Sequence, residues 1–326
     1  MKLDATIACD PAAAARLAAD LEADGYDGVW TAETQHDPFL PLAAAAVTTS
    51  RVTLGTAIAT AFTRSPMVTA MSAWDLQRAS GGRFVLGLGT QVRAHNVRRF
   101  SVGWEPPVPR LRELVEALRH IWGAFQGEHP LRFRGRFYRH DLMTPFFDPG
   151  PIEEGAPPIY LAAVTPAVYR LAGEVADGVH VHVFHTVRYL REVALPALGK
   201  RRPQLTLASG VFVVLRGDAD AVRTQIAFYG STPTYRPVFE VHGWEGLQER
   251  LHGLMARGDL AAMAAAIDDE VLAEFAVIAD SWDDAWRQIR ERYAGILDRV
   301  GVYGLRTPSG TDAAEIAAAF RRTSPD

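Results

Sequence analysis

The chain has 326 residues, a formal net charge of -4 and a single cysteine, Cys9. The weakly acidic charge gives no basic surface for nucleic acid or an anionic membrane, and one cysteine excludes an intrachain disulfide framework. The sequence has neither the apolar run of a signal peptide nor an uncharged stretch of ~18 apolar residues. We expect a soluble cytoplasmic protein with no nucleic-acid or membrane partner.

The first third of the chain repeats a short apolar strand, a turn and a helix. Strands are predicted at Leu3–Ala8, Asp27–Ala32, Val52–Ala57 and Arg83–Leu88. Two of the intervening helices begin with a capping side chain followed by proline, at Asp10-Pro11 and Ser65-Pro66, and such pairs favour a helix start. Strands alternating with helices predict right-handed βαβ crossovers and a parallel sheet.

The same unit resumes after residue 158. Further strands are predicted at Ile159–Ala162, Gly178–Val183, Leu205–Leu215 and Phe275–Ala279. Two insertions interrupt the alternation, at about residues 127–157, with a small hairpin around Leu131–Tyr138, and at about residues 230–260; insertions of this kind often shape binding sites. Eight strands alternating with helices predict an α/β fold, a (β/α)8 TIM barrel with insertions, in a single domain over residues 1–326.

The fourth predicted strand ends in backbone that a ligand can approach. Gly87-Leu88-Gly89 closes an apolar run typical of a buried parallel strand, and glycines let a flat or charged ligand come close to the main chain. In (β/α)8 barrels the active face lies at the carboxyl ends of the strands, so Gly89, Thr90 and Gln91 are predicted there. A dinucleotide motif is not formed, because Val92 stands where the third glycine of G-x-G-x-x-G is needed.

Thr165-Pro166 is predicted to begin a helix at the same face. The free N–H groups of a first helical turn form an anion site, which suits a phosphate beside Val164 and Thr165. A plain helix start is the alternative interpretation of these residues.

Polar residues gather after the second strand, at Glu33, Gln35, His36 and Asp37. A carboxylate and an imidazole near a reacting centre supply general acid–base catalysis, so Glu33 and His36 are the predicted catalytic residues. Asp37 precedes a proline and is interpreted instead as the cap of the next helix.

His180-Val181-His182 places two alternating histidines on one strand, a pattern that metal-dependent barrel hydrolases use. Asp280, just after the last predicted strand, would complete such a metal site. The ends of the fourth and fifth strands add only Gly89-Thr90 and Ala163-Val164, with no Lys, His or carboxylate. We therefore predict no metal and a His182 that faces the substrate, with a hydrogen-bonded core histidine as the alternative.

Five segments together resemble the luciferase-like flavin and deazaflavin oxidoreductases, and specifically the branch that uses coenzyme F420. The resemblance spans essentially the whole chain. It is carried by Gly25–Glu33 (GYDGVWTAE), Leu54–Ala59 (LGTAIA), Phe62–Pro66 (FTRSP), Gly81–Gly89 (GGRFVLGLG) and Leu171–Gly178 (LAGEVADG).

The resemblance implies a bulge with a non-proline cis peptide near Ala57-Ile58, lying against one face of the deazaflavin ring. Related enzymes often have an acidic residue followed directly by histidine after the second strand, whereas this chain has Glu33-Thr34 and then His36. The predicted cofactor-binding residues are Thr34, Ala57, Ile58, Ala59, Gly89, Thr90 and Gln91 around the ring, and Val164 and Thr165 at the phosphate. Phe62 and His182 are predicted to bind substrate.

The predicted function is hydride transfer between coenzyme F420 and a small, apolar organic substrate, with the chemistry supplied by the cofactor and the geometry by the protein. One alternative is an FMN-dependent monooxygenase that uses reduced flavin and oxygen. A second is a cofactor-binding protein without turnover, or a metal-dependent hydrolase.

Relatives in the resembled family commonly form dimers through helices beside the second and third strands. The alanine run Ala43–Ala46 is small-sided enough for such close packing, so a homodimer is predicted. The alternative is that the same alanines pack on their own barrel.

Overall fold

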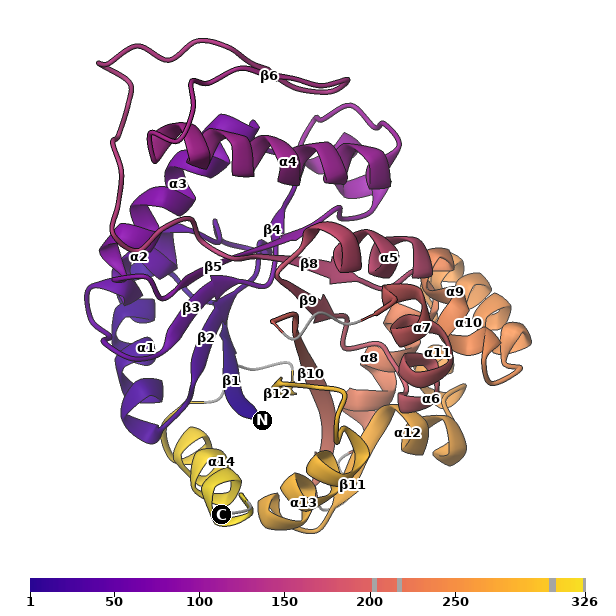
Figure 1. Cartoon of the computed structure of the whole chain (residues 1–326). Helices are drawn as coiled ribbons and strands as arrows, with labels where there is room; N and C mark the ends of the chain where they lie inside the picture. Colours follow the sequence, from indigo (N-terminus) through magenta and orange to yellow (C-terminus); the bar gives the residue numbers. More distant parts are fainter. Residues whose placement is uncertain (201–203, 216–218, 305–308, 325–326) are drawn as a thin grey trace. The chain divides into compact units, whose positions relative to one another are not determined.

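Parallel strands connected by helices make up most of the chain (Figure 1). The computed structural model describes residues 1–200, 204–215, 219–304 and 309–324. Its strands are β1 (Lys2–Ile7), β2 (Gly28–Thr31), β3 (Thr53–Thr56), β4 (Ala59–Thr60), β5 (Phe84–Gly89), β6 (Phe133–Arg134), β7 (Arg139–His140), β8 (Ile159–Ala163), β9 (Gly178–Val181), β10 (Thr206–Leu215), β11 (Ala276–Ala279) and β12 (Arg299–Tyr303).

The helices vary widely in length. They are α1 (Pro11–Asp24), α2 (Leu40–Ala46), α3 (Pro66–Ala79), α4 (Pro107–Phe125), α5 (Pro166–Val175), α6 (Val187–Tyr189), α7 (Leu195–Leu198), α8 (Asp220–Gly230), α9 (Arg236–Glu240), α10 (Glu245–Arg257), α11 (Leu260–Ala265), α12 (Asp269–Phe275), α13 (Trp282–Arg292) and α14 (Gly310–Arg322), with the segments η1 (His95–Arg99), η2 (Leu190–Ala194) and η3 (Pro233–Tyr235). Within the described ranges, no helix combines the length and the apolar character needed to cross a bilayer.

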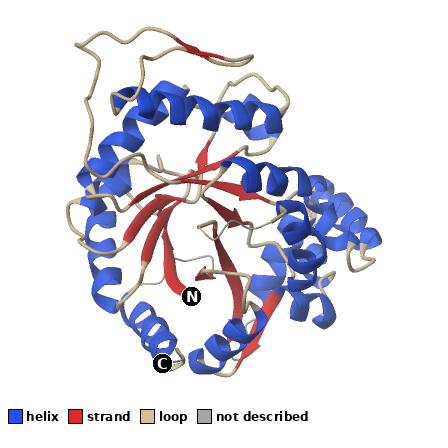
Figure 2. Ribbon diagram, in the orientation of Figure 1, coloured by secondary structure: helices blue, strands red, loops and turns tan. Residues whose placement is uncertain are grey.

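The strand order defines the fold. Along the sheet the hydrogen-bonded order is β11-β10-β12-β1-β2-β3-β5-β8-β9, and β9 also pairs with β10. The pairs β2–β3, β3–β5, β5–β8 and β10–β12 are parallel. Figure 2 shows these strands and the helices that connect them. The predicted (β/α)8 TIM barrel is therefore confirmed.

The prediction of the eighth barrel strand is wrong. Residues 276–279 do form a strand, β11, but in the strand order it adjoins only β10. The strand between β10 and β1 is instead β12, which the sequence analysis missed. Its first residue, Arg299, is buried and forms a bidentate ion pair with Asp4 of β1, at 2.6 and 2.9 Å. A strand that begins with a charged residue is not predicted as a buried strand from the sequence. Burial of that charge is acceptable only when a partner neutralises it.

Residue contacts divide the chain into two compact units. Unit 1 comprises Met1–Ala5, Ala163–Arg170 and Val181–Asp326, and unit 2 comprises Thr6–Ala162 and Leu171–His180. The single domain predicted for residues 1–326 stays a prediction.

Unit 2 carries the helices α1 to α4, and two of them begin as predicted. The Asp10 carboxylate accepts the N–H groups of Ala12 and Ala13 at 2.9 and 3.1 Å, and the Ser65 hydroxyl accepts that of Val68 at 3.2 Å. Both caps satisfy donors that the first helical turn leaves unpaired.

The insertion at residues 127–157 contains the antiparallel strands β6 and β7, which extend beyond α4 in Figure 1. The predicted hairpin is confirmed, with its strands shifted by about two residues. The carboxylate of Glu113 in α4 holds its turn by accepting N–H bonds from Arg136, Phe137 and Tyr138 at 2.7–2.8 Å. A Cβ at Gly135 would come within 2.0 Å of this carboxylate, so the turn requires glycine there.

In unit 1, the segment at residues 230–260 is largely helical, whereas the sequence analysis predicted no helix in it. It contains η3, α9 and α10, and the helices α11 and α12 follow. Helix α10 ends at Gly258, whose φ of +73° is the left-handed conformation that glycine adopts easily. The carboxylates of Asp259 and Asp268 then cap α11 and α12 by accepting N–H bonds from Ala262 and Val271. Short helices with a polar cap at each start have the composition of a loop, so the sequence pattern does not predict them as helices.

Glu22 joins the end of α1 to the start of β3. Its carboxylate accepts the N–H groups of Ser50, Arg51 and Val52 at 3.0, 2.6 and 2.8 Å. Burial alone raises the pKa of Glu22, but these hydrogen bonds outweigh burial and lower the pKa from 4.5 to about 2. The ionised carboxylate therefore stabilises the folded state.

We predict that Glu22→Gln lowers the free energy of unfolding by about 2 kcal/mol at neutral pH, because the amide leaves backbone donors unpaired. The folded-state pKa lies below the ordinary value, so the stabilisation is complete above about pH 4.5 and is lost as the pH falls toward 2. Urea unfolding of both proteins across this range measures the difference. A difference that does not shrink with decreasing pH would contradict the assignment.

Candidate active site

The candidate residues of unit 2 follow the carboxyl ends of β2, β3 and β5. Glu33, Thr34 and His36 come after β2, Ala57 and Ile58 separate β3 from β4, and the glycine that ends β5 is followed by Thr90 and Gln91. Because β2, β3 and β5 are parallel neighbours, these segments share one edge of the sheet.

The backbone between β3 and β4 is tightly fixed. The Ala57–Ile58 peptide is cis, as the family resemblance implied. The carbonyl of Ile58 accepts the N–H of Glu33 at 3.0 Å, and the N–H of Ala57 bonds to the carbonyl of Thr31 at 2.6 Å. A Cβ at Gly89 would lie 2.9 Å from the Ile58 side chain. A larger residue at the end of β5 would therefore displace the end of the Ile58 side chain.

Glu33 is a buried carboxylate with all of its strong partners in unit 2. Its Oε2 accepts the N–H of Thr60 at 2.7 Å and pairs with Arg64 Nη1 at 2.9 Å. The other end of the guanidinium bonds to Asp37 at 2.6 Å. Burial works to lower the pKa of Arg64, but the hydrogen bonds and charges of Glu33 and Asp37 outweigh it and raise the pKa. Arg64 therefore stays charged between two carboxylates.

The two predicted catalytic residues have different surroundings. Glu33 is engaged in this network, whereas His36 is exposed on the loop after β2. The charge of His36 acts on Asp10: backbone hydrogen bonds chiefly lower the pKa of Asp10, and His36 adds to the effect. Asp37 accepts the N–H of Phe39 at 2.8 Å, but the N-cap of α2 is Phe39 itself, so Asp37 orders the turn before the helix rather than capping it from the predicted position. The catalytic roles of Glu33 and His36 stay predictions.

Phe62, a predicted substrate residue, is buried beneath a cation from α4. The guanidinium of Arg110 lies 4.5 Å from the centroid of the Phe62 ring, a cation–π distance. Arg110 Nε also donates to the hydroxyl of Tyr138 in the insertion, at 3.1 Å. Neither Arg110 nor Tyr138 was found from the sequence, since only the fold brings them to Phe62.

The loop after β5 is organised by Asn96 of η1. This buried side chain donates to the carbonyls of Thr90 and Val92 at 2.9 and 3.2 Å. Gln91 has a φ of +55° and accepts the N–H of Val92 at 2.9 Å. Arg99, also in η1, donates to the carbonyl of Thr34. No motif in the sequence marks Asn96 or Arg99, so neither was predicted.

The predicted phosphate loop lies in unit 1, where α5 begins. The carbonyl of Thr165 accepts the N–H groups of Val168 and Tyr169 at 3.0 and 3.1 Å, which starts the helix. The hydroxyl of Tyr189 donates to the carbonyl of Val164. Burial raises the pKa of Tyr189, so this phenol keeps its proton and holds the loop as a donor.

The two histidines of the β9 region have different neighbours. In unit 2, the His180 ring lies 4.8 Å from that of Trp30 and 5.3 Å from that of Tyr160. In unit 1, the His182 ring lies 4.8 Å from those of Tyr229 and Tyr235. Across the described ranges, no group of three or more His, Cys, Asp or Glu side chains is arranged to hold a metal ion.

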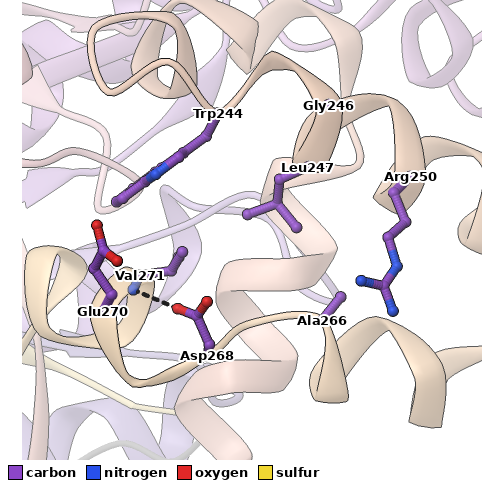
Figure 3. A pocket seen from close by; sticks show the side chains of 8 residues that line it. All are labelled: Trp244, Gly246, Leu247, Arg250, Ala266, Asp268, Glu270 and Val271. Atoms are coloured by element: carbon purple, nitrogen blue, oxygen red, sulfur yellow. Dashed lines mark hydrogen bonds between the residues drawn. The ribbon is translucent and has the colours of Figure 1, made fainter.

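A surface cavity of about 340 Å³ opens beside α10 and α12 of unit 1 (Figure 3). Trp244 and Glu270 line one part of it and Arg250 another, while Asp268 bonds to the N–H of Val271 as a helix cap. None of the predicted site residues borders this cavity.

A model of the luciferase-like monooxygenase family matches residues 3–299, and the chain belongs to this family. An uncharacterized protein of Mycobacterium tuberculosis is 47% identical over 92% of each chain. The F420-dependent glucose-6-phosphate dehydrogenase of Intrasporangium calvum is 30% identical over 82% of this chain and 81% of its own. Among solved structures, the coenzyme F420-dependent tetrahydromethanopterin reductase of Methanopyrus kandleri has a TM-score of 0.78, with 21% identity over 98% of this chain and 97% of its own.

We predict that Glu33→Gln lowers the free energy of unfolding by about 2 kcal/mol, because Arg64 loses one of its two carboxylates in a largely buried position. Asp37→Asn is the matched control: its carboxylate is more exposed, and the amide oxygen still accepts the N–H of Phe39. Urea unfolding at neutral pH compares the two variants. If Asp37→Asn proved the more destabilising, Glu33 would not be the central member of the network.

Proposed function

We propose that this protein is a coenzyme F420-dependent oxidoreductase that transfers a hydride between the deazaflavin and a small, apolar organic substrate. Family membership supports an oxidoreductase, and the relative from Intrasporangium calvum supports F420 as the cofactor. The observation that carries the proposal is the uncharged segment Ala57–Ile58 at the carboxyl ends of β3 and β5, whose side chains are partly exposed next to the buried Ala59 and Gly89. A flat aromatic ring binds to such a surface without displacing side chains.

Three features of this edge fit a tricyclic ring. A Cβ at Gly89 would collide with Ile58, so the end of β5 presents only backbone. The hydroxyl of Thr60 and Oδ1 of Asn96 are buried without hydrogen-bond partners in the described part of the chain. Buried polar atoms are usually hydrogen-bonded. The N–H and C=O groups on the edge of a deazaflavin ring supply both donors and acceptors for these two atoms.

The remaining cofactor residues are assigned by their place in the fold. Thr34, Thr90 and Gln91 border the ring on the loops after β2 and β5. Val164 and Thr165 bind the phosphate through the first turn of α5, a use supported by the free N–H groups of helix starts. Tyr189 orients Val164 for this role.

The bound deazaflavin supplies the hydride chemistry, and the protein's residues position and protonate. Glu33 fixes the backbone of β4 through the N–H of Thr60, so its role is to hold the ring's platform. His36, exposed on the same loop, is the proposed proton donor. Phe62 and His182 bind the substrate.

An FMN-dependent monooxygenase is the second candidate, since the family model describes monooxygenases. FMN shares the flat tricyclic ring and the phosphate tail, so the same residues suit both cofactors. Reduced flavin would then react with oxygen rather than transfer a hydride directly.

We predict that the apoprotein binds coenzyme F420 at least about ten-fold more tightly than FMN, a difference of roughly 1.4 kcal/mol. Fluorescence titration with each cofactor measures both affinities. Gly89→Val should weaken F420 binding by displacing the Ile58 side chain, whereas Gly103→Ala, where an added Cβ meets nothing within 4 Å, should not. Tight FMN binding without F420 binding would establish the second candidate instead.

The predicted homodimer is supported by apolar side chains on adjacent helices of unit 2. Leu40 and Val47 are 60% and 76% exposed at the two ends of α2, and Val68 and Met71 are 51% and 53% exposed on α3. Exposed apolar side chains on neighbouring helices favour burial against a second surface.

We predict that the wild-type protein sediments as a dimer and that Val47→Glu combined with Met71→Glu yields a monomer, because charges replace the apolar contact. Leu142→Glu, at a 78% exposed site in the insertion, is the control and should leave the dimer intact. Sedimentation velocity distinguishes the species. A wild-type monomer at micromolar concentration contradicts the proposed dimer.

A further inference from the structure

The surface cavity beside α10 and α12 is formed entirely by unit 1, and charged as well as apolar side chains line it (Figure 3). Arg250 contributes a guanidinium, and Asp268 and Glu270 contribute two carboxylates. Leu247 and Val271 add apolar surface. The volume of about 340 Å³ is in the range of small-molecule sites. Among the described residues of the lining, negative charges exceed positive charges by one, which favours a ligand of net positive charge.

One end of the cavity is built around Trp244. The ring of His242 lies parallel to that of Trp244, with centroids 4.2 Å apart and 12° between the planes. A hydrogen bond of 2.8 Å between His242 Nε2 and the hydroxyl of Thr186 holds the stack in place. Burial lowers the pKa of His242, so this imidazole is neutral at physiological pH and does not repel a cation. Trp244 is thereby fixed where it lines the cavity.

Glu270 lies on the same side of the cavity as Trp244 (Figure 3). Its charge acts to raise the pKa of His242, against the larger effect of burial, so the carboxylate is near the stacked rings. An aromatic face and a carboxylate together attract an ammonium group, through a cation–π contact and a charge-assisted hydrogen bond. This end of the cavity therefore suits an ammonium group.

The remaining charges suit an anion and a second cation. Arg250 lies on the opposite side of Leu247 from Glu270 (Figure 3), and a guanidinium binds a carboxylate through two parallel hydrogen bonds. Asp268 accepts the N–H of Val271 with one oxygen, at 2.9 Å, which leaves its second oxygen for an external donor. Within the described ranges neither Arg250 nor Glu270 forms an ion pair, so both charges are available to a ligand.

We propose that this cavity binds a free basic amino acid of the lysine type. Its α-carboxylate pairs with Arg250 and its α-ammonium with Asp268. Its side-chain ammonium pairs with Glu270 against the ring of Trp244, and its methylene groups lie on Leu247. The ligand carries one net positive charge, which neutralises the lining. An apolar amino acid would leave Glu270 without a counter-charge, and a diamine would leave Arg250 without one.

Binding of L-lysine to the full-length protein tests this proposal against three analogues, each of which lacks one charged group. Norleucine lacks the side-chain ammonium, 6-aminohexanoate the α-ammonium and cadaverine the α-carboxylate. Because the charged side chains of the cavity are exposed and exposed ion pairs contribute little, we expect a dissociation constant for lysine on the order of 1 mM. Each analogue should bind at least about three-fold more weakly.

The indole N–H resonances of isotope-labelled protein report the binding. The resonance that shifts with lysine should be the one that is missing from Trp244→Phe. No shift at concentrations up to about 20 mM, a shift of a different indole alone, or an analogue that binds as tightly as lysine overturns the proposal.

Variants at exposed positions, which leave the core intact, assign the individual contacts. Glu270→Gln should weaken lysine binding about three-fold and leave norleucine binding unchanged. Arg250→Met should weaken the binding of lysine and norleucine, but not that of cadaverine. Arg257→Met, in the last turn of α10 and outside the cavity, is the matched control with unchanged affinities. Equal losses of lysine affinity in Arg250→Met and Arg257→Met would contradict a direct contact with Arg250.

Discussion

The carboxylate of Glu33 accepts a hydrogen bond from the backbone N–H of Thr60 and forms an ion pair with Arg64, at the carboxyl ends of β2 and β4. This one carboxylate therefore connects two separate loops of unit 2. Asp37 also pairs with Arg64, and it connects the network to the residues just before α2. A buried carboxylate is stable only when its oxygens are matched by donors. The arrangement therefore holds the segment from Ala57 to Thr60 in one conformation, beside the glycine that ends β5.

The same device recurs in unit 2. Glu22 holds the entry to β3 through three backbone N–H groups, and Glu113 holds the hairpin turn of the insertion through another three. For both Glu22 and Glu113, a carboxylate on a helix accepts N–H bonds from a loop that lacks the regular hydrogen bonds of a helix or strand. The loops that these carboxylates contact are thereby ordered by charge-assisted hydrogen bonds as well as by apolar packing.

Local patterns allowed much of this architecture to be predicted. The cap-and-proline pairs at Asp10 and Ser65 act over only three residues, so the sequence alone predicts them. The apolar strand that ends at Gly89 is one continuous run, so it is predicted as well. By contrast, β12 was missed because Arg299 looks like a surface residue until Asp4, 295 positions away in the chain, neutralises it. Arg64, Arg110 and Tyr189 were missed for a related reason. Their partners come close only in the folded structure, and no spacing in the sequence predicts these contacts.

The proposed function depends on the uncharged, partly exposed segment Ala57–Ile58, which suits a flat cofactor ring. Its central claim is that Ala57, Ile58 and Gly89 form the platform for a deazaflavin. A crystal structure of the protein grown with oxidised coenzyme F420 tests this claim most directly. The account predicts the tricyclic ring in van der Waals contact with these residues. A ring bound elsewhere, such as against Trp244 in the cavity beside α10, would contradict it.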